Sequence, residues 1–360
     1  MWSLKCLHHF TPATHDRPRL RKVDVEPALC GHRDCNSRFE TLNSLNLVLQ
    51  FDRQVYPVYR FSLCVLVTVH FMATLASAPA IRREVGSDGT VKLTFCAAHE
   101  TAYEACLLNL PYRQVSRVIC VSTQIGCPFD CTFCAVGDTP FLRNLSGAEI
   151  LEQIIAVSRD PAWIDEDFEV AAMGTGEPLF ALQELLQGIV EARSHLPRLC
   201  SLNISTVGLP AKIREYAQTK VCGVRLNLQI SLHGTSDEQR GIVMPRATTA
   251  AGLKSVLEAC EEFALLHRRH VVVNYLLLRG INDSIVDAQR LVSLLSPEYF
   301  TVKISALNPV SDGKVFGTDH TALQSFCSSL RALGLEARVF TSAGSDISAG
   351  CGQFSNNLSL

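Results

Sequence analysis

The sequence predicts a parallel α/β fold, and three observations support this prediction. Strand-like and helix-like segments alternate along the chain from about Val118 onward. The strand-like segments are mostly apolar and rich in Val and Ile, as parallel strands covered on both faces should be. Six strand–helix units follow one another, which fits either a partial barrel or an open sheet.

The expected elements begin with a hairpin. Residues Glu84–Phe95 read EVGSDGTVKLTF, in which SDGT supplies the turn between two strand-like stretches. After the hairpin we expect strands at Val118–Thr123, Phe168–Met173, Leu202–Thr206, Val224–Ser231, His270–Leu277 and Phe300–Ala306, and a seventh short strand at Ala337–Phe340. We expect helices at Ser146–Ser158, Ala181–Ser194, Ala250–Leu265, Ile285–Leu295 and Thr321–Leu333. The first helix starts with Ser146 and Glu149 at the spacing of a capping box.

Composition narrows the class of protein. The chain has 360 residues, a hydrophobic content of 47%, a net charge of −2 and 15 cysteines. The small net charge gives no global basic field that would indicate nucleic acid, although it is compatible with a local basic groove. Because the chain is long and opens without the apolar run of a signal peptide, we expect a reducing, cytoplasmic compartment. Some of the thiols are then candidate metal ligands or catalysts.

Residues 1–80 differ from the rest, and their role is unknown. They contain an apolar run from Phe61 to about Ala80, which is near the length of a membrane span but which we interpret as a buried helix or strand. Cys30, His32 and Cys35 lie close together, yet no second ligand pair follows at a useful spacing, so we do not expect zinc there. We divide the remainder into a hairpin lead-in at 81–115 and a core domain at 116–360.

Distinctive polar residues occur at the same place in several units, where a strand ends. Gly176 and Glu177 follow the second strand, Ser205 and Thr206 end the third, Ser231 and His233 end the fourth, and Asn308 follows the sixth. Any one of these residues alone is best interpreted as a turn former or a cap. Parallel α/β folds build their active sites at the carboxyl ends of their strands, so the shared position predicts one site.

Three cysteines are crowded into the loop after the first expected strand. Cys127, Cys131 and Cys134 lie in GCPFDCTFCAVGD with the spacing Cys-x3-Cys-x2-Cys. A structural zinc site needs a fourth nearby ligand, and none is obvious. A [4Fe–4S] cluster is normally held by four thiolates, so three thiolates leave one iron open to a substrate or cofactor. The loop therefore predicts an iron–sulfur cluster on the face that carries the polar residues.

This loop resembles the signature of radical S-adenosylmethionine (SAM) enzymes. The motifs CVSTQIGCPFDCTFCAVGD, RNLSGAEI, MGTGEPL, ISTVG, QISLHGTSDEQR, INDS, ALNP and DISAGCGQF come in the order seen in the radical SAM adenine methyltransferases of 23S ribosomal RNA. The resemblance covers roughly residues 84–354. It implies a partial (β/α)6 barrel with an atypical N-terminal extension, because residues 1–80 do not read as the small helical domain with which that family opens.

The resemblance also implies the cofactors and the residues that bind them. The three loop cysteines match the ligands of a [4Fe–4S] cluster, whose open iron is chelated by SAM; reductive cleavage of SAM then gives a 5′-deoxyadenosyl radical. Gly176 and Glu177 match the segment that holds the amino group of SAM. The other positions that match SAM-binding residues are Ser205, Ser231, Leu232, His233 and Asn308.

Two distant cysteines match the methyl-transfer machinery of that family. A ring carbon of adenine is electrophilic and cannot attack the methyl group of SAM, so Cys351 is methylated first and its methyl group becomes a radical that adds to the ring. Cys120 matches the partner thiol, which attacks Cys351, forms a disulfide and releases the methylated base. Glu104 matches the proton acceptor and Glu100 competes for that role; for both, a solvent-facing strand glutamate is the alternative.

The resemblance favours methylation at C2 of a 23S rRNA adenine, with transfer RNA as a second substrate. C8 methylation of the same base, a radical SAM reaction on a non-RNA substrate, and a non-enzymatic zinc- or cluster-binding RNA-interaction protein are the alternatives. As partners we expect RNA and an electron donor such as flavodoxin or ferredoxin. We expect no membrane association, and a monomer.

Overall fold

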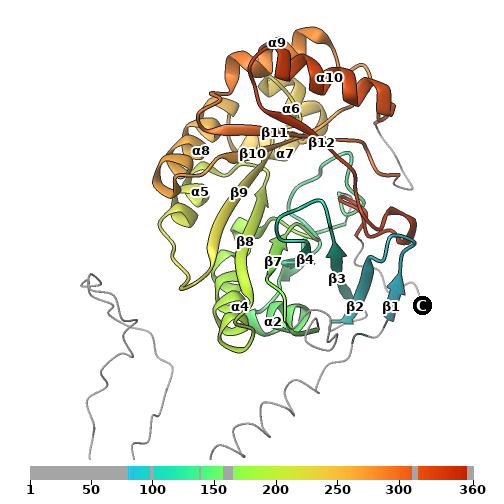
Figure 1. The fold of residues 1–360 in the computed structure, drawn as a ribbon, viewed down its shortest axis with the longest axis vertical. Helices are drawn as coiled ribbons and strands as arrows, with labels where there is room; N and C mark the ends of the chain where they lie inside the picture. The colour runs from blue at the N-terminus through green and yellow to red at the C-terminus, as the bar shows by residue number, and fades with distance from the viewer. Residues whose placement is uncertain are drawn as a thin grey trace, which may run out of the picture. The chain divides into compact units, whose positions relative to one another are not determined.

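The computed structural model describes residues 80, 82–97, 101–137, 139–156, 165–309 and 315–354. Within these residues a ten-stranded sheet runs in the order β1-β2-β3-β4-β7-β8-β9-β10-β11-β12, so neighbours in the sheet follow one another along the chain (Figure 1). A separate two-stranded sheet pairs β5 (Gln124–Ile125) with β6 (Arg143–Asn144). The expectations for residues 1–79, including the zinc question and most of the apolar run, lie outside the described residues.

The first strands form an antiparallel lead-in. The predicted hairpin is present as β1 (Arg82–Val85) and β2 (Val91–Cys96). Next comes β3 (Ala102–Asn109), which no sequence pattern predicted, and it pairs antiparallel with both β2 and β4 (Arg117–Val121). The boundary that we drew between residues 115 and 116 falls in the turn between β3 and β4, and it stays a prediction.

The remaining strands are parallel, as the sequence predicted. From β4 onward each strand pairs in parallel with the next, including the short seventh one. They are β7 (Phe168–Ala172), β8 (Leu199–Thr206), β9 (Arg225–Ser231), β10 (Val271–Leu276), β11 (Phe300–Ser305) and β12 (Ala337–Phe340). The mixed sheet and its parallel part match the partial radical SAM barrel that was expected.

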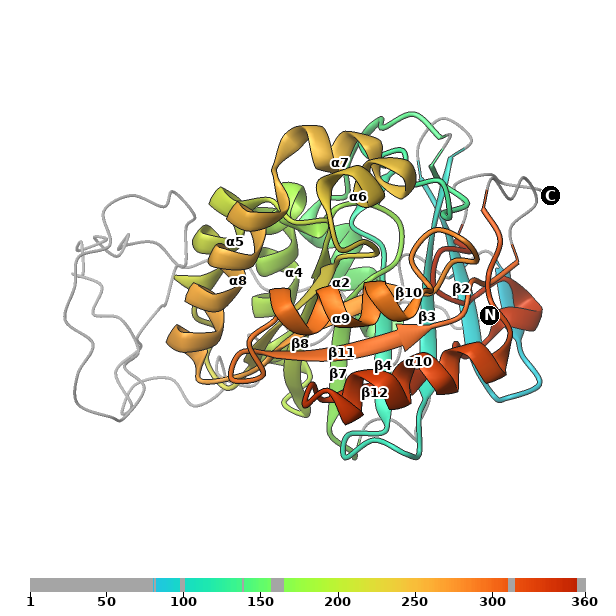
Figure 2. The same cartoon turned by 90° about the horizontal axis from the view of Figure 1, so that it is seen from above.

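Helices follow the parallel strands and cover the outer side of the sheet (Figure 2). Those that the sequence predicted are α2 (Gly147–Ile155), α4 (Leu182–His195), α8 (Leu253–His267), α9 (Ile285–Leu294) and α10 (His320–Ala332). The capping box of Ser146 and Glu149 is present at the start of α2. The short helices α5 (Pro210–Ala217), α6 (Asp237–Val243) and α7 (Pro245–Ala250) were not predicted.

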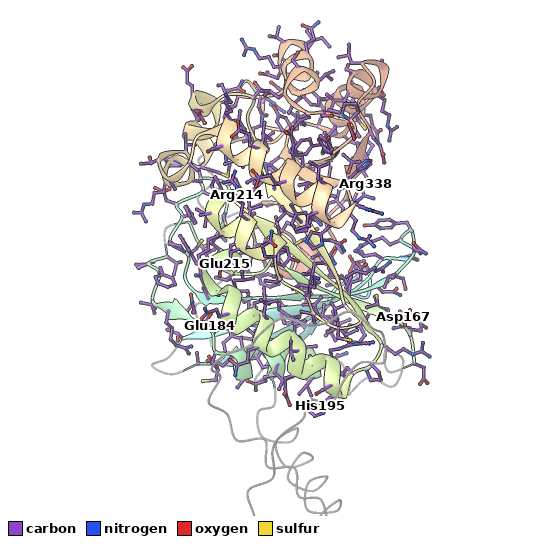
Figure 3. All side chains as sticks on the ribbon, turned by 90° about the vertical axis from the view of Figure 1, so that its left-hand side faces the viewer. Asp167, Glu184, His195, Arg214, Glu215 and Arg338 are labelled. Atoms are coloured by element: carbon purple, nitrogen blue, oxygen red, sulfur yellow. The ribbon has the colours of Figure 1, made fainter. Side chains whose placement is uncertain are left out.

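The outer faces of these helices carry charged side chains. Glu184 and His195 lie on α4, and Arg214 and Glu215 lie on α5 (Figure 3). Arg214 forms an ion pair with Glu262 on α8 at 2.7 Å. Such exposed pairs contribute little to stability, so the fold depends on the apolar layer beneath the helices. None of the described helices is long and apolar enough to cross a membrane.

The two faces of the parallel strands differ, contrary to the expectation of strands that are apolar on both faces. In β9, Leu226, Leu228 and Ile230 are buried against the helices, whereas Asn227 and Gln229 alternate with them on the opposite, inner face. The inner polar groups satisfy one another across strands, for example in the 3.1 Å hydrogen bond from Asn227 to Asn203. The expectation of strands that are apolar on both faces is therefore wrong, because the inner face borders a polar cavity rather than a second helix layer.

Candidate active site

One cavity brings together most of the residues that the sequence singled out. It contains about 1210 Å³ of empty space, counting the open solvent at its mouth, and lies at the carboxyl ends of the parallel strands. Its walls include the three loop cysteines together with Gly176, Glu177, Ser205, Ser231, His233, Asn308 and Cys351. The shared position of polar residues after the strands therefore corresponds to one site. Leu232, Cys120 and Glu104 are not among the residues that line it.

The three-cysteine loop is a compact turn held by backbone hydrogen bonds. The N–H of Cys134 donates to the carbonyl of Cys131 at 3.1 Å, and the N–H of Gly137 donates to the carbonyl of Cys134 at 3.0 Å. A Cβ atom on Gly137 would lie 2.5 Å from the Cys131 carbonyl oxygen, so only glycine fits there. Burial raises the pKa of the Cys127 thiol to about 12. These thiols would ionise when bound to a cationic metal centre.

The three loop thiols share one stretch of the cavity wall. No group of three His, Cys, Asp or Glu side chains in the described part of the chain converges closely enough to hold one metal ion. The thiolates of a [4Fe–4S] cluster bind different irons, so they need not converge on one point. The cavity walls can therefore hold such a cluster through Cys127, Cys131 and Cys134.

Glu177 places a buried carboxylate in the cavity wall. It precedes the short 3₁₀ helix η2 (Pro178–Ala181) and is 2% exposed. Its Oε1 accepts from the N–H of Leu179 at 3.1 Å, and its Oε2 accepts from the N–H of Val207 at 2.9 Å. Burial raises the pKa of Glu177 to about 7, and no described ion pair includes it. A ligand that brings an ammonium group would supply the missing positive charge.

Gly176 is required by the position of its neighbours. Its φ of +108° lies in a region that favours glycine, and a Cβ atom there would lie 2.6 Å from the Cβ of Gln124. Gln124 in turn accepts a hydrogen bond from the N–H of Glu177 through Oε1, at 2.8 Å. A side chain at position 176 would therefore displace the residue that orients Glu177.

Two buried polar atoms in the cavity wall have no partner among the described residues. They are Oγ1 of Thr175 and Oδ1 of Asn274. The Nδ2 of Asn274 is already used, because it donates to Oγ of Ser205 at 3.0 Å. Buried polar groups are nearly always hydrogen-bonded, so these two atoms indicate that a polar ligand completes the site. SAM, with its amino, ribose and adenine groups, has the donors and acceptors for this role.

His233 is a neutral hydrogen-bond donor at the end of β9. Its Nδ1 accepts from the N–H of Leu276 at 3.0 Å, so the neutral ring carries its proton on Nε2. Burial, aided by the charges of Arg240 and Lys303, lowers the pKa of His233 to about 3. The preceding residue, Leu232, has a fully buried side chain. Its backbone N–H donates to the carbonyl of Asn274 at 3.1 Å, which connects the end of β9 to β10.

Asn308 holds the segment that carries Cys351. Its Nδ2 donates to Oγ of Ser342 at 2.8 Å and to the carbonyl oxygen of Cys351 at 2.9 Å. Gln353 adds a hydrogen bond to the carbonyl of Pro309 at 2.9 Å. We call residues 341–354 the C-terminal segment. These bonds place the exposed Cys351 in the cavity wall beside the loop of three cysteines, where the N–H of Ala135 donates to the carbonyl of Gly352 at 2.7 Å.

Cys120 lies on β4, behind the cavity wall. It packs in one apolar cluster with Ala349 and Phe354 of the C-terminal segment. The pKa of Cys120 is raised to about 12, mainly by burial and to a smaller extent by the nearby Cys351 thiol. The structure therefore brings the two distant cysteines into one neighbourhood, although only Cys351 lines the cavity.

Glu104 is buried on β3 and is not a solvent-facing strand glutamate. It is 5% exposed and forms an ion pair with Lys92 on β2 at 3.1 Å. That alternative is therefore wrong for Glu104. Glu100, the competing candidate, lies outside the described residues.

Lys303 is a cavity residue that sequence reasoning missed. It is 9% exposed, donates to Oε1 of Gln229 at 3.0 Å and lies over the ring of Phe340, with its Nζ 4.7 Å from the ring centroid. Burial lowers the pKa of Lys303 to about 8, while the nearby Cys351 thiol opposes this shift. The signal in the sequence was the alternation of polar and apolar residues within the strands, which places Lys303 and Asn274 on the inner face.

Comparisons with known proteins now decide the family. A model of the radical SAM superfamily matches residues 121–292. A protein named probable dual-specificity RNA methyltransferase RlmN, from Thermus thermophilus, is 35% identical over 272 residues, which are 74% of this chain and 74% of that protein. The chain belongs to the RlmN family of radical SAM methyltransferases.

Further comparisons agree with the RlmN assignment. The dual-specificity RNA methyltransferase RlmN of Geotalea uraniireducens is 33% identical over 290 residues, which cover 79% of this chain and 81% of that protein. A crystal structure of a radical SAM methyltransferase from Sphaerobacter thermophilus matches with a TM-score of 0.71 and 28% identity, covering 84% of this chain and 89% of that one. This RlmN-family chain is therefore an enzyme, and its superfamily implies a [4Fe–4S] cluster and SAM.

Proposed function

We propose that this enzyme methylates a ring carbon of an adenine in RNA through an S-methylcysteine on Cys351. C2 of a 23S rRNA adenine is the favoured target, and transfer RNA is a second substrate. The observation that carries the proposal is the meeting of Cys351, the three-cysteine loop and Glu177 in one cavity, with Cys120 packed behind it. The dual-specificity RNA methyltransferases among its relatives support the choice of RNA.

The roles of the cofactor-binding residues follow from their chemistry. Cys127, Cys131 and Cys134 would hold the cluster, which when bound supplies the electron that cleaves SAM to a 5′-deoxyadenosyl radical. Glu177 would pair with the amino group of SAM, because it is a buried carboxylate without a cationic partner in the described structure. The remaining contacts to SAM would come from Gly176, Ser205, Ser231, Leu232, His233 and Asn308.

The protein's own residues carry out the transfer. Cys351 is exposed in the cavity wall and accepts the methyl group on its sulfur. Once the carrier is bonded to the adenine ring, Glu104 takes up the proton lost from the ring, and the cluster, when bound, would take back the unpaired electron of the adduct. Cys120 then attacks the sulfur of Cys351, so that a Cys120–Cys351 disulfide forms and the carbon–sulfur bond breaks. The proton of the Cys120 thiol passes to the released carbon, and the methylated base leaves.

The position of Lys303 supports this division of roles. Its ammonium group is buried close to both thiols and has no carboxylate partner among the described ion pairs. A buried positive charge there stabilises negative charge that develops in this part of the cavity during the transfer.

The proposal extends to partners and compartment. A one-electron donor such as flavodoxin or ferredoxin is needed to reduce the cluster, and we propose a cytoplasmic monomer. All described cysteines are free thiols, which supports a reducing compartment.

Anaerobic incubation with SAM, a one-electron reductant and protein-free ribosomal RNA, followed by nucleoside mass spectrometry, tests the proposed function. We expect 2-methyladenosine in the RNA. The appearance of 8-methyladenosine would move the target to C8, and a SAM-cleaving enzyme that leaves RNA unmethylated would overturn the RNA substrate. A colourless protein that binds zinc would overturn the radical chemistry itself.

A further inference from the structure

A third cysteine stands beside the two that the proposed function uses. In the register of the lead-in strands, Cys106 on β3 lies directly opposite Cys120 on β4 and directly opposite Lys92 on β2. Residues directly opposite in antiparallel strands point to the same face of the sheet, with Cα atoms about 4.5–5.5 Å apart. Disulfides span Cα separations of about 4.4–6.8 Å, so Cys106 and Cys120 can be joined without moving the strands apart.

Cys106 also contacts the C-terminal segment. Its Sγ lies 3.9 Å from the carbonyl oxygen of Ala349, two residues before Cys351. Cys106, Ala349 and Phe354 form one buried cluster, and Cys120 and Ile347 pack against it. Three thiols from three parts of the chain therefore share one neighbourhood. By contrast, a buried thiol such as Cys260 lies in the outer helical layer, on α8.

We propose that Cys106 is a second resolving thiol, which takes over the disulfide from Cys351 after each methyl transfer. This step rests on the Cys120–Cys351 disulfide of the proposed function. The sulfur of Cys106 attacks the sulfur of Cys120, a Cys106–Cys120 bond forms, and the Cys120–Cys351 bond breaks. The proton of Cys106 passes to the sulfur of Cys351, so the exchange needs no outside oxidant or reductant. An external dithiol later reduces the Cys106–Cys120 disulfide.

The surroundings of the three thiols favour this direction of exchange. Cys351 is exposed, so the sulfur that is released is solvated, whereas Cys106 is fully buried. Burial holds the pKa of the Cys106 thiol well above its usual value, with smaller influences from Cys120, Glu104, Lys92 and Cys351. Because Cys106 stays protonated at rest, it does not compete with Cys351 for the methyl group of SAM. The exchange frees Cys351 for the next methyl group, while the disulfide now joins β3 and β4.

Disulfide mapping of the holoenzyme after one turnover tests this proposal. The enzyme is incubated anaerobically with SAM, RNA and a one-electron reductant but no dithiol, and free thiols are then blocked and the peptides sequenced by mass spectrometry. Fragmentation must separate Cys106 from Cys96, and Cys120 from the cluster cysteines, because these pairs share tryptic peptides. We expect a Cys106–Cys120 disulfide with Cys351 free. A parent enzyme that holds only the Cys120–Cys351 disulfide would overturn the proposal.

Variants of Cys106 extend this test. Cys106→Ser should methylate RNA normally in the first turnover and retain the Cys120–Cys351 disulfide. Its Cys351 should therefore not be methylated again until a dithiol is added, whereas Cys351 of the parent is free to accept a second methyl group. Cys106→Val fills the same space with an apolar side chain. It should therefore give the same result as Cys106→Ser, even if serine disturbs the packing of the buried apolar cluster. Cys260→Ser, which changes an equally buried thiol, should behave as the parent. Equal second methylation of Cys351 without dithiol in both Cys106 variants and the parent would contradict the role of Cys106.

A final measurement separates this proposal from the proposed function. The parent is equilibrated in a glutathione redox buffer without SAM or RNA, and its disulfides are mapped. We expect a Cys106–Cys120 disulfide, and its absence would overturn the proposal whether or not RNA is methylated. If this disulfide forms but no variant ever methylates RNA, the thiol pair stands and the proposed function fails.

Discussion

The side-chain amide of Asn308 donates a hydrogen bond to the backbone carbonyl of Cys351 over 2.9 Å. The same Nδ2 also binds Oγ of Ser342 at 2.8 Å. Asn308 therefore joins the end of the sixth parallel strand unit to the segment that presents the proposed methyl-accepting sulfur. This contact gives Asn308 a positioning role in addition to any contact with SAM.

Asn308→Ala should slow the methylation of Cys351 more than it weakens the binding of SAM. It removes two hydrogen bonds that each contribute ~0.5–1.5 kcal/mol, so a loss of about one decade in rate is expected. Intact-protein mass spectrometry measures methylation of Cys351, and equilibrium dialysis measures SAM affinity. Ser342→Ala, which removes one partner of Asn308, should show a smaller loss in rate. A drop in SAM affinity with unchanged methylation at saturating SAM would assign Asn308 to SAM binding alone.

SAM affinity should depend on pH through Glu177. Its folded pKa is raised to about 7, so the carboxylate is ionised above that pH and protonated below it. Only the ionised form attracts an ammonium group, so affinity should fall as pH drops through 7. Glu177→Gln should lose about one to two decades of affinity, from a charge-assisted bond of ~1.5–3 kcal/mol, and should flatten the profile. Isothermal titration at several pH values checks both results, and an identical profile in parent and variant would remove Glu177 from the SAM site.

Cys131→Ala should abolish the production of 5′-deoxyadenosine. It removes one of three thiolates that would hold the cluster, so iron content and the broad absorbance at roughly 400 nm should fall together. Cys96→Ala, which removes an exposed thiol on β2, is the matched control and should keep both signals. SAM cleavage at the parent rate in the Cys131 variant would disprove the cluster assignment.

The variants Cys120→Ala and Cys351→Ala should fail in different ways. Without Cys351 there is no sulfur to accept the methyl group, so neither methylated RNA nor a covalent adduct should form. Without Cys120 the carrier can still bond to adenine but cannot be released by disulfide formation. RNA should therefore accumulate on Cys351, seen as a slow-migrating protein band that collapses on nuclease treatment. Normal methylation by both variants would show that the methyl-cysteine mechanism does not apply.

The parallel strands and the longer helices were predictable because each type of element shows a recognisable sequence pattern. The strand β10 reads VVVNYL and is rich in Val, and α2 carries its capping box in the sequence. By contrast, β3 reads AYEACLLN and is buried on both faces, so it shows no alternation that would distinguish it from a helix. The helices α5–α7 span only six to eight residues each, too few for a clear helical period.

The site was predictable where its residues follow strand ends and not where they lie within strands. Glu177 and His233 stand in loops that the topology gathers at one edge. Lys303 and Asn274 sit inside β11 and β10, where only the inner face of the curved sheet decides that they meet the cavity. The cross-strand pairing of Cys106 with Cys120 depends on the register between β3 and β4. This register could not be predicted because β3 itself was not predicted from the sequence.

The turn of the first hairpin fastens the C-terminal segment. Asp88 accepts the N–H of Gly344 at 2.8 Å, and Asp346 accepts the N–H of Ser87 at 2.8 Å. These bonds join residues 256 and 259 positions apart, respectively, so the entropy cost of closing such loops favours their formation after the intervening sheet has assembled. Hydrogen exchange at the amides of Ser87 and Gly344 therefore reports how often the C-terminal segment, which carries Cys351, detaches from the hairpin turn. This measurement does not depend on any cofactor.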